Sequence, residues 1–211
     1  MDIATYIQNF PAKEFQRGEL LLQKGDSTSQ LMAIRNGFVK VTSINANGVE
    51  RLVWIAGRYD IAPTEQLFSK HGEVRFFYTA LTDGSFYEIN KADLLSAASK
   101  DPVIMAEIAR NMSIHYDDFL QRIDAVDSAT VKERLMRTLC YLAERLSADS
   151  TVDLFEYGLK ISHQDLSSMI GSTRETTSVM LSELRSEDLI QYSRQKFTVH
   201  VDKLKTTLGN Y

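Results

Sequence analysis

The stretch SHQDLSSMIGSTRETTSVMLSEL, residues 162–184, holds two helix starts separated by a glycine. Ser162 and Ser172 are each followed three residues later by an acidic residue, which fits a capping box that satisfies free backbone N–H groups. Gly171 lies between them and tolerates the left-handed conformation that commonly ends a helix. The stretch therefore predicts two short helices joined through a glycine turn, which is a helix-turn-helix.

The second of these helices combines an apolar stripe with a polar N-terminal part. The stripe consists of Val179, Met180, Leu181 and Leu184. The polar side chains that gather near the N-terminus are Arg174, Glu175, Thr176, Ser178 and Ser182. In a helix-turn-helix this end of the second helix enters the major groove of DNA. Arginine can donate two hydrogen bonds to guanine, glutamate can accept one from the cytosine amino group, and short hydroxyl side chains can serve bases or phosphates.

Two alternating segments, residues 189–192 and 196–201, follow around a polar turn and predict a hairpin, or wing. Arg194 and Lys196 in this turn are placed to reach phosphates, and a solvated basic turn is the alternative for each of them. The candidate DNA contacts are therefore Arg174, Glu175, Thr176, Ser178, Thr173, Ser162, His163 and Lys196.

The N-terminal part of the chain has the pattern of short strands. Between residues 14 and 90, apolar and polar positions alternate in short runs broken by glycines. Asn47-Gly48 between two such runs is a strong signal for a tight hairpin, because a type I′ turn needs two residues at positive φ. The spacing predicts a compact antiparallel barrel or roll.

A long helix is predicted after Pro102, which suits the first turn of a helix. Its apolar side chains follow the spacing of a coiled-coil seam: Ala109, Met112, Tyr116, Phe119, Ile123 and Val126. Large aromatic residues in the seam favour a partner helix, and the alternative is an amphipathic helix packed on its own domain. Thr130 and Glu133 fit a capping box for the next helix, so a break and hinge are expected at Asp127.

These elements predict an α+β chain with three parts. Residues 1–100 form an antiparallel, jelly-roll-like β-roll, residues 101–127 a dimerisation helix, and residues 128–211 a winged helix-turn-helix domain.

Composition excludes several classes of function. The net charge is −4, and from Ser128 onward 11 basic residues balance 11 acidic ones, so a DNA-binding face has to be local. The single cysteine, Cys140, lies in an apolar helical pattern, which excludes an internal disulfide and favours a buried thiol. The four histidines lack metal-ligand spacing, so we expect no metal. There is no membrane-spanning run and no secretory signal, which predicts a cytoplasmic protein.

Several motifs, in this order along nearly the whole chain, resemble the Crp/Fnr family of bacterial transcription regulators. The matching residues are 17–20 with 25–26, 36–37, 80–83, and 164–176, which is similar to the family's recognition motif with its Arg-Glu-Thr core. The resemblance implies a homodimer joined through the long helix, double-stranded DNA with a near-palindromic promoter site as its partner, and contact with RNA polymerase.

The segment that matches the cyclic-nucleotide site of such regulators departs from their pattern. The resemblance implies a Gly-Glu pair and, about ten residues on, an arginine followed by a hydroxyl residue; here these regions read IAPTE, residues 61–65, and Val74-Arg75. One residue along a strand changes the face, so Arg75 is expected to point away from the interior unless a bulge corrects it. We therefore expect no cofactor and no control by cyclic AMP; the alternative is a shifted phosphate site with Arg75, Thr64 and Glu65.

Other sensing modes and functions have less support. An iron-sulfur regulator needs a cysteine cluster. For haem, His71 or His115 are conceivable ligands, but surface histidines are the expectation. Val179 occupies the place of an arginine found in relatives that read TGTGA, and could contact a thymine methyl or pack. An enzyme is not expected, because paired acids and a glycine-rich phosphate loop are missing, and a non-DNA regulatory module remains an alternative.

Overall fold

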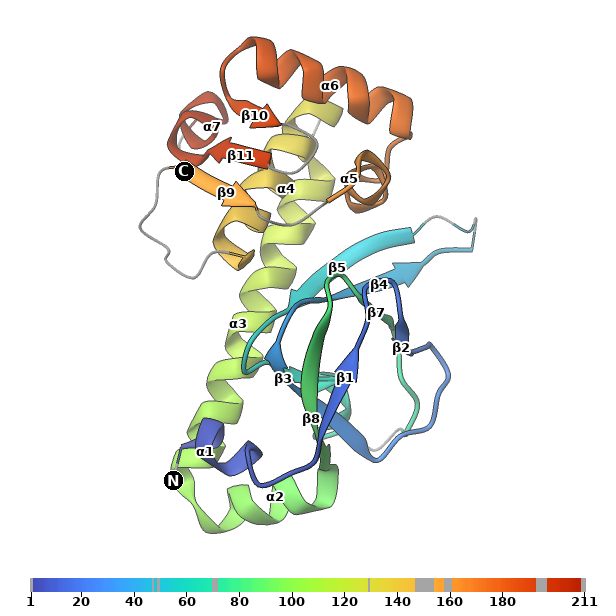
Figure 1. The fold of residues 1–211 in the computed structure, drawn as a ribbon, viewed down its shortest axis with the longest axis vertical. Coiled ribbons are helices and arrows are strands. Elements are labelled where there is room, and N and C mark those ends of the chain that lie inside the picture. The colour runs from blue at the N-terminus through green and yellow to red at the C-terminus, as the bar shows by residue number, and fades with distance from the viewer. Residues whose placement is uncertain are drawn as a thin grey trace. The chain divides into compact units, whose positions relative to one another are not determined.

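The computed structural model describes residues 2–46, 48, 50–69, 72–128, 130–146, 154–157, 161–192 and 197–209. It divides into two compact units (Figure 1). The first consists of Met1–Ser43 with Val53–Phe119, and the second of Ile44–Leu52 with Leu120–Tyr211. The predicted boundary at residue 127 therefore differs from this division, which falls inside a helix.

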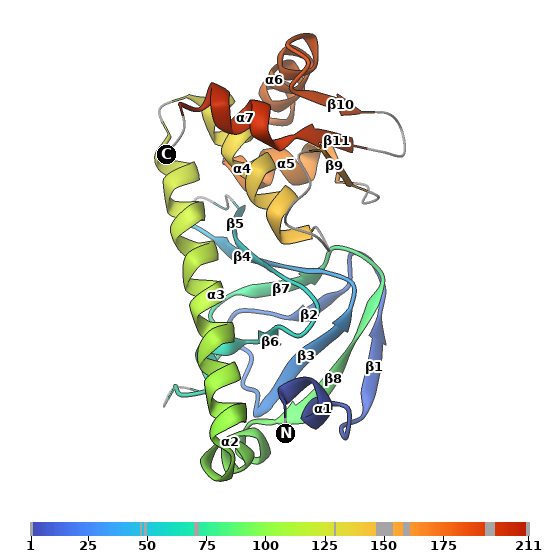
Figure 2. The same cartoon turned by 90° about the vertical axis from the view of Figure 1, so that its left-hand side faces the viewer.

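The first unit is built on two four-stranded sheets, with strand orders β1-β8-β3-β6 and β2-β7-β4-β5 (Figure 2). The strands are β1 (Ala12–Phe15), β2 (Leu20–Leu22), β3 (Gln30–Asn36), β4 (Val39–Ile44), β5 (Glu50–Ala56), β6 (Ile61–Ala62), β7 (Phe77–Ala80) and β8 (Gly84–Asn90). The α+β class and the antiparallel roll predicted from the alternating pattern are confirmed.

The turn between β3 and β4 needs its glycine. Gly37 has φ +79°, and a Cβ there would lie 2.6 Å from the carbonyl oxygen of Asp83. No other residue fits this close approach of two backbones. At the predicted β4–β5 hairpin, Gly48 has φ +76°, while Asn47 lies outside the described residues.

Helices complete the first unit: α1 (Ile3–Ile7), the short 3-10 helix η1 (Thr64–Gln66), α2 (Lys91–Lys100) and α3 (Pro102–Asp127). The part of α3 within this unit packs Ile104 and Ile108, which are 3% and 1% exposed, against a core on one face of the β1-β8-β3-β6 sheet. The core also contains Leu31, Ile61 and Ile89. The predicted long helix from Pro102 is therefore confirmed.

The predicted seam lies on the side of α3 that faces solvent. Tyr116, Ile123 and Phe119 are 62%, 48% and 45% exposed, and Met112 is 39% exposed. Ala109 is also exposed, and the side chain of Val126 lies outside the description. The alternative, that this stripe packs on its own domain, is wrong for these side chains.

The second unit continues with α4 (Val131–Leu146), β9 (Leu154–Tyr157), α5 (His163–Ile170), α6 (Arg174–Ser186), β10 (Ile190–Tyr192), β11 (Phe197–His200) and α7 (Val201–Thr207). The predicted box at the start of α4 is confirmed, since Thr130 and Glu133 exchange backbone-to-side-chain hydrogen bonds of 3.1 Å. Strands β10 and β11 form the predicted antiparallel hairpin. Its turn, with Arg194 and Lys196, lies outside the described residues.

Candidate DNA-binding surface

The first helix of the helix-turn-helix, α5, starts and ends as predicted. The Ser162 hydroxyl accepts a hydrogen bond from the Asp165 N–H at 3.0 Å, and the Asp165 carboxylate accepts one from the Ser162 N–H at 3.0 Å. Gly171 ends the helix with φ 62° and ψ 44°, the left-handed conformation. The capping box and the left-handed glycine therefore fix the length of α5 and the position of the turn.

The second helix, α6, starts one residue later than the capping pattern predicted. Its N-cap is Thr173, whose hydroxyl accepts from the Thr176 N–H at 3.1 Å. The predicted box of Ser172 with Glu175 is wrong, because the Ser172 N–H instead closes the end of α5 by donating to the Ser167 carbonyl at 3.0 Å. Thr173, which the sequence predicted as a DNA contact, therefore also caps α6.

The exposed face of α6 is polar at its start. Arg174, Glu175 and Thr173 are exposed, Thr176 and Ser178 are half-buried, and Thr177 is fully buried. Thr177 replaces Val179 in the buried stripe beside Leu181 and Leu184, with its hydroxyl donating to the Thr173 carbonyl at 2.8 Å. The placement of Val179 in the apolar stripe is wrong, since its side chain is 61% exposed.

Ser178 joins the two helices. Its hydroxyl lies 2.8 Å from Nδ1 of His163, the first residue of α5, and donates to the Arg174 carbonyl at 2.9 Å. The His163 ring also meets the Tyr192 ring edge-on, at 5.7 Å between centroids. The structure therefore brings His163 and Ser178 together beside Arg174, while Ser162 is exposed and acts as a cap.

A buried arginine connects α3 with the helix-turn-helix. Arg122, near the end of α3, is 2% exposed, and its Nη1 donates to the Thr138 hydroxyl at 2.8 Å. Its Nη2 donates to the carbonyl of Met169 in the last turn of α5. Burial lowers the pKa of Arg122 below its usual value. Sequence patterns missed this residue, because an arginine inside an amphipathic helix carries no signal of its partners.

Two basic residues of α4, Arg134 and Lys132, contact the two helices of the helix-turn-helix. Arg134 Nε donates to the Ile170 carbonyl at 3.2 Å, so two arginines supply donors to the C-terminal carbonyls of α5, which its own helix leaves free. Lys132 reaches α6, where its Nζ lies 2.7 Å from both Glu183 and Glu187. Hydrogen bonds to Glu183 and then to Glu187 raise the pKa of Lys132.

Replacing Gly171 by alanine is expected to lower the free energy of unfolding by about 1 kcal/mol. A Cβ at Gly171 meets no atom within 4 Å, so the cost is the positive φ alone. Urea unfolding followed by circular dichroism measures it. Gly72→Ala is the control, because that Cβ makes only an ordinary contact of 3.7 Å with the Ser27 hydroxyl. If both variants lowered the free energy of unfolding equally, the positive φ at Gly171 would not be the cause of the loss.

The predicted ligand residues of the roll are separated. Val74 is 1% exposed and belongs to the core, whereas the adjacent Arg75 is exposed. Both carboxylate oxygens of Glu65 lie 3.1 Å from the hydroxyl of the fully buried Tyr78, which donates to them. Burial first, and then Glu65, raise the pKa of Tyr78 well above its usual value. Glu65 is thus engaged by Tyr78, and no ion pair joins it to Arg75 in the described part of the chain.

Thr64 takes part in a second buried cluster, with a histidine of α3. The Thr64 hydroxyl lies 2.8 Å from Nδ1 of His115, and Nε2 of that ring lies 3.3 Å from Asp60. The His115 side chain is 10% exposed, and its ring centroid lies 3.8 Å from that of Trp54. The expectation of a surface histidine is therefore wrong for His115, and His71 lies outside the described residues.

The buried thiol makes a pH-dependent contribution to stability. Burial raises the pKa of Cys140 to about 11 from 9.0, so the folded chain holds this proton to higher pH than the unfolded chain. The stability is full below pH 9 and falls as the pH rises toward 11, by about 1 kcal/mol between pH 8 and pH 10. Urea unfolding should show this decrease in the parent beyond any decrease in Cys140→Ala; parallel decreases would contradict it.

Neither a metal site nor a membrane span emerges from the described part of the chain. Its histidine, cysteine, aspartate and glutamate side chains form no group of three or more that could hold a metal ion. None of its helices is long and apolar enough to cross a membrane.

The comparisons with known proteins agree with this arrangement. Residues 12–101 match the model of the cyclic nucleotide-binding domain, and residues 133–206 match that of the Crp-like helix-turn-helix domain. The global nitrogen regulator of Synechococcus elongatus is 23% identical over 188 residues, covering 89% of this chain and 84% of the relative. The electron transport regulator A of Shewanella oneidensis is 27% identical over 202 residues, 94% of this chain and 78% of the relative.

A solved structure with a similar fold is that of the c-di-GMP responsive global regulator CLP of Xanthomonas campestris. It has a TM-score of 0.77 and 19% sequence identity, and the match covers 94% of this chain and 97% of that one. With both domain models matched in the order that the fold displays, the chain belongs to the Crp/Fnr family of DNA-binding transcription regulators.

Proposed function

We propose that the chain acts as a homodimer that binds a near-palindromic promoter site and is not controlled by cyclic AMP. The observation that carries the DNA-binding part is the exposed N-terminal face of α6, where Arg174 and Glu175 stand free of the buried stripe. In a dimer, two such helices enter successive major grooves about 34 Å apart. Because the proposed target is a promoter, we also propose that the protein acts in the cytoplasm and that RNA polymerase is a further partner.

The exposed seam of α3 supports the homodimer. Tyr116, Phe119 and Ile123 form an apolar stripe on a continuous helix, and such a stripe is stabilised by burial against the same stripe of a second copy. We expect sedimentation to give a dimer for the parent and a monomer for the double variant Tyr116→Asp, Ile123→Asp. The same double change at the exposed polar positions Arg110 and Ser113 is the control. A monomeric parent would contradict the proposal.

The roll interior supports independence from cyclic AMP. Val74 and Tyr78 are buried in the core, together with Met32, Val41 and Trp54, and Arg75 is exposed. Isothermal titration with cyclic AMP and cyclic GMP tests this part, and we expect no micromolar binding. Micromolar binding that Arg75→Ala abolishes would instead establish the shifted phosphate site.

Selection from random DNA sequences, followed by electrophoretic mobility shift, tests the proposed site. We expect enrichment of a sequence with two half-sites in inverted orientation. If no such sequence is enriched while the dimer is intact, the helix-turn-helix serves another contact, as in a regulatory module that does not read DNA.

A further inference from the structure

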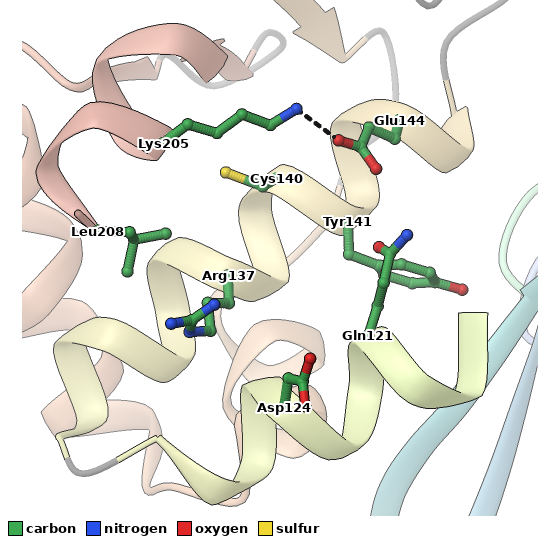
Figure 3. A pocket seen from close by; sticks show the side chains of 8 residues that line it. All are labelled: Gln121, Asp124, Arg137, Cys140, Tyr141, Glu144, Lys205 and Leu208. Atoms are coloured by element: carbon green, nitrogen blue, oxygen red, sulfur yellow. Dashed lines mark ion pairs between the residues drawn. The ribbon is translucent and has the colours of Figure 1, made fainter. Parts of the chain in front are cut away.

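A cleft in the second unit lies between α3, α4 and α7 (Figure 3). Its volume is about 320 Å³, within the range of sites for small molecules. Gln121 and Asp124 line it from α3, Arg137 from α4, and Leu208 lies just beyond α7. All of these residues belong to one compact unit.

One pair of charges in the cleft is already neutralised. Lys205 of α7 and Glu144 of α4 form an ion pair of 2.8 Å, drawn as the dashed line in Figure 3. The hydrogen bond to Glu144 raises the pKa of Lys205. This pair connects α7 to α4 and leaves the other charged side chains of the cleft, Arg137 and Asp124, to determine which ligand fits.

Arg137 lines the cleft, and one donor of its guanidinium group has no partner in the described part of the chain. Its Nε is buried and has no hydrogen-bond partner among the residues that the structure describes. Leaving a buried donor without an acceptor costs free energy, so an acceptor that binds beside the Arg137 guanidinium would stabilise the folded chain. The planar fork of a guanidinium fits the two oxygens of a carboxylate.

Asp124 restricts the ligand further. Its carboxylate projects from α3 on the wall that faces α4, and it forms no ion pair with any described residue. A carboxylate in the same cleft repels a doubly charged anion such as phosphate and attracts an ammonium group. The cleft therefore offers complementary charges to a molecule that carries one carboxylate and one ammonium group.

The remaining wall is apolar and neutral. Leu208 and the buried Cys140 line it, and the raised pKa of the thiol keeps the sulfur uncharged at neutral pH. This wall suits a small apolar side chain. Gln121 lies two residues from both Phe119 and Ile123, about 200° around the helix, so its side chain does not lie on the side of the seam.

We propose that this cleft binds a small α-amino acid, with Arg137 holding the carboxylate and Asp124 the ammonium group. The ligand would contact α3, α4 and α7 at once. It would thereby fix the last turns of α3, where Gln121 and Asp124 lie, against the first helix of the DNA-binding unit. The site does not depend on DNA binding, so the two proposals can fail separately.

Thermal shift and isothermal titration of the full chain with each common L-α-amino acid test the site. We expect at least one to bind with one molecule per chain. Its analogues that lack either the amine or the carboxylate should bind at least about tenfold more weakly. Failure of every amino acid to bind, or equally tight binding of acetate or inorganic phosphate, would overturn the proposal.

Variants then locate the ligand. Arg137→Met and Asp124→Asn should each weaken binding about tenfold or more, and Arg137→Lys should retain part of it. Arg110→Met, at an exposed position of α3, is the matched control and should bind as the parent does. Circular dichroism verifies that each variant is folded. Unchanged affinity in folded Arg137→Met would place the ligand elsewhere and overturn the proposal.

Discussion

Replacing Arg122 by alanine is expected to lower the free energy of unfolding of the second unit by about 2–4 kcal/mol. The guanidinium is 2% exposed and donates to the Thr138 hydroxyl and the Met169 carbonyl. Alanine leaves that carbonyl without its donor and opens a cavity among α3, α4 and α5. Urea unfolding followed by circular dichroism measures the loss.

Two further variants separate the causes. Arg122→Met restores much of the volume without the donors, so it should recover only the part of the loss that comes from the cavity. Arg110→Ala, at an exposed position of the same helix, should change stability by less than about 0.5 kcal/mol. A loss no larger for Arg122→Ala than for Arg110→Ala would show that the buried hydrogen bonds contribute little.

Replacing Arg174 by alanine is expected to cost about 1–3 kcal/mol of binding to the selected DNA site and to relax the preference at one base pair. Arg174 is exposed as the first residue of α6, next to Thr173, which caps the helix with its own side chain. The change therefore removes a base contact without removing the cap. Mobility shift on all single-base variants of the site measures both effects.

Lys196→Ala is the comparison, because a phosphate contact from the wing should weaken binding to all sequences to a similar degree and reduce its salt dependence. If Arg174→Ala instead weakened binding to all sequences equally, Arg174 would not be a residue that reads a base. The 61% exposure of Val179 leaves its side chain available to a thymine methyl group, which adds a preference that Val179→Ala should relax.

The sequence predicted the elements whose signals are local. The box at Ser162 and the glycine turn at Gly171 depend on neighbours within a few residues, and both are confirmed. The expectation that Arg75 points away from the interior is confirmed, with Val74 buried, although both residues precede β7 and do not lie in a strand. The start of α6 was wrong by one residue, because Ser172 and Thr173 are both able to cap and only the closure of α5 decides between them.

Other features depend on residues that are distant in the sequence and could not be predicted. His115 is buried because Asp60, Thr64 and Trp54 meet it from the roll, and no local pattern of α3 signals this. The contacts of Lys132 with Glu183 and of Arg122 with Met169 likewise join residues that are distant in the sequence. Strand β9 and helix α7 were also missed.

The position of Arg122 bears on how the chain can be divided. A fragment that begins at residue 128 contains the whole helix-turn-helix but lacks the guanidinium that supplies Thr138 and Met169. A fragment that keeps these hydrogen bonds therefore has to include Arg122, and one that begins at Leu120, where the second unit resumes, does so. The last two turns of the long helix thus belong with the helix-turn-helix, and a truncated gene that separates them would encode a DNA-binding part without these hydrogen bonds.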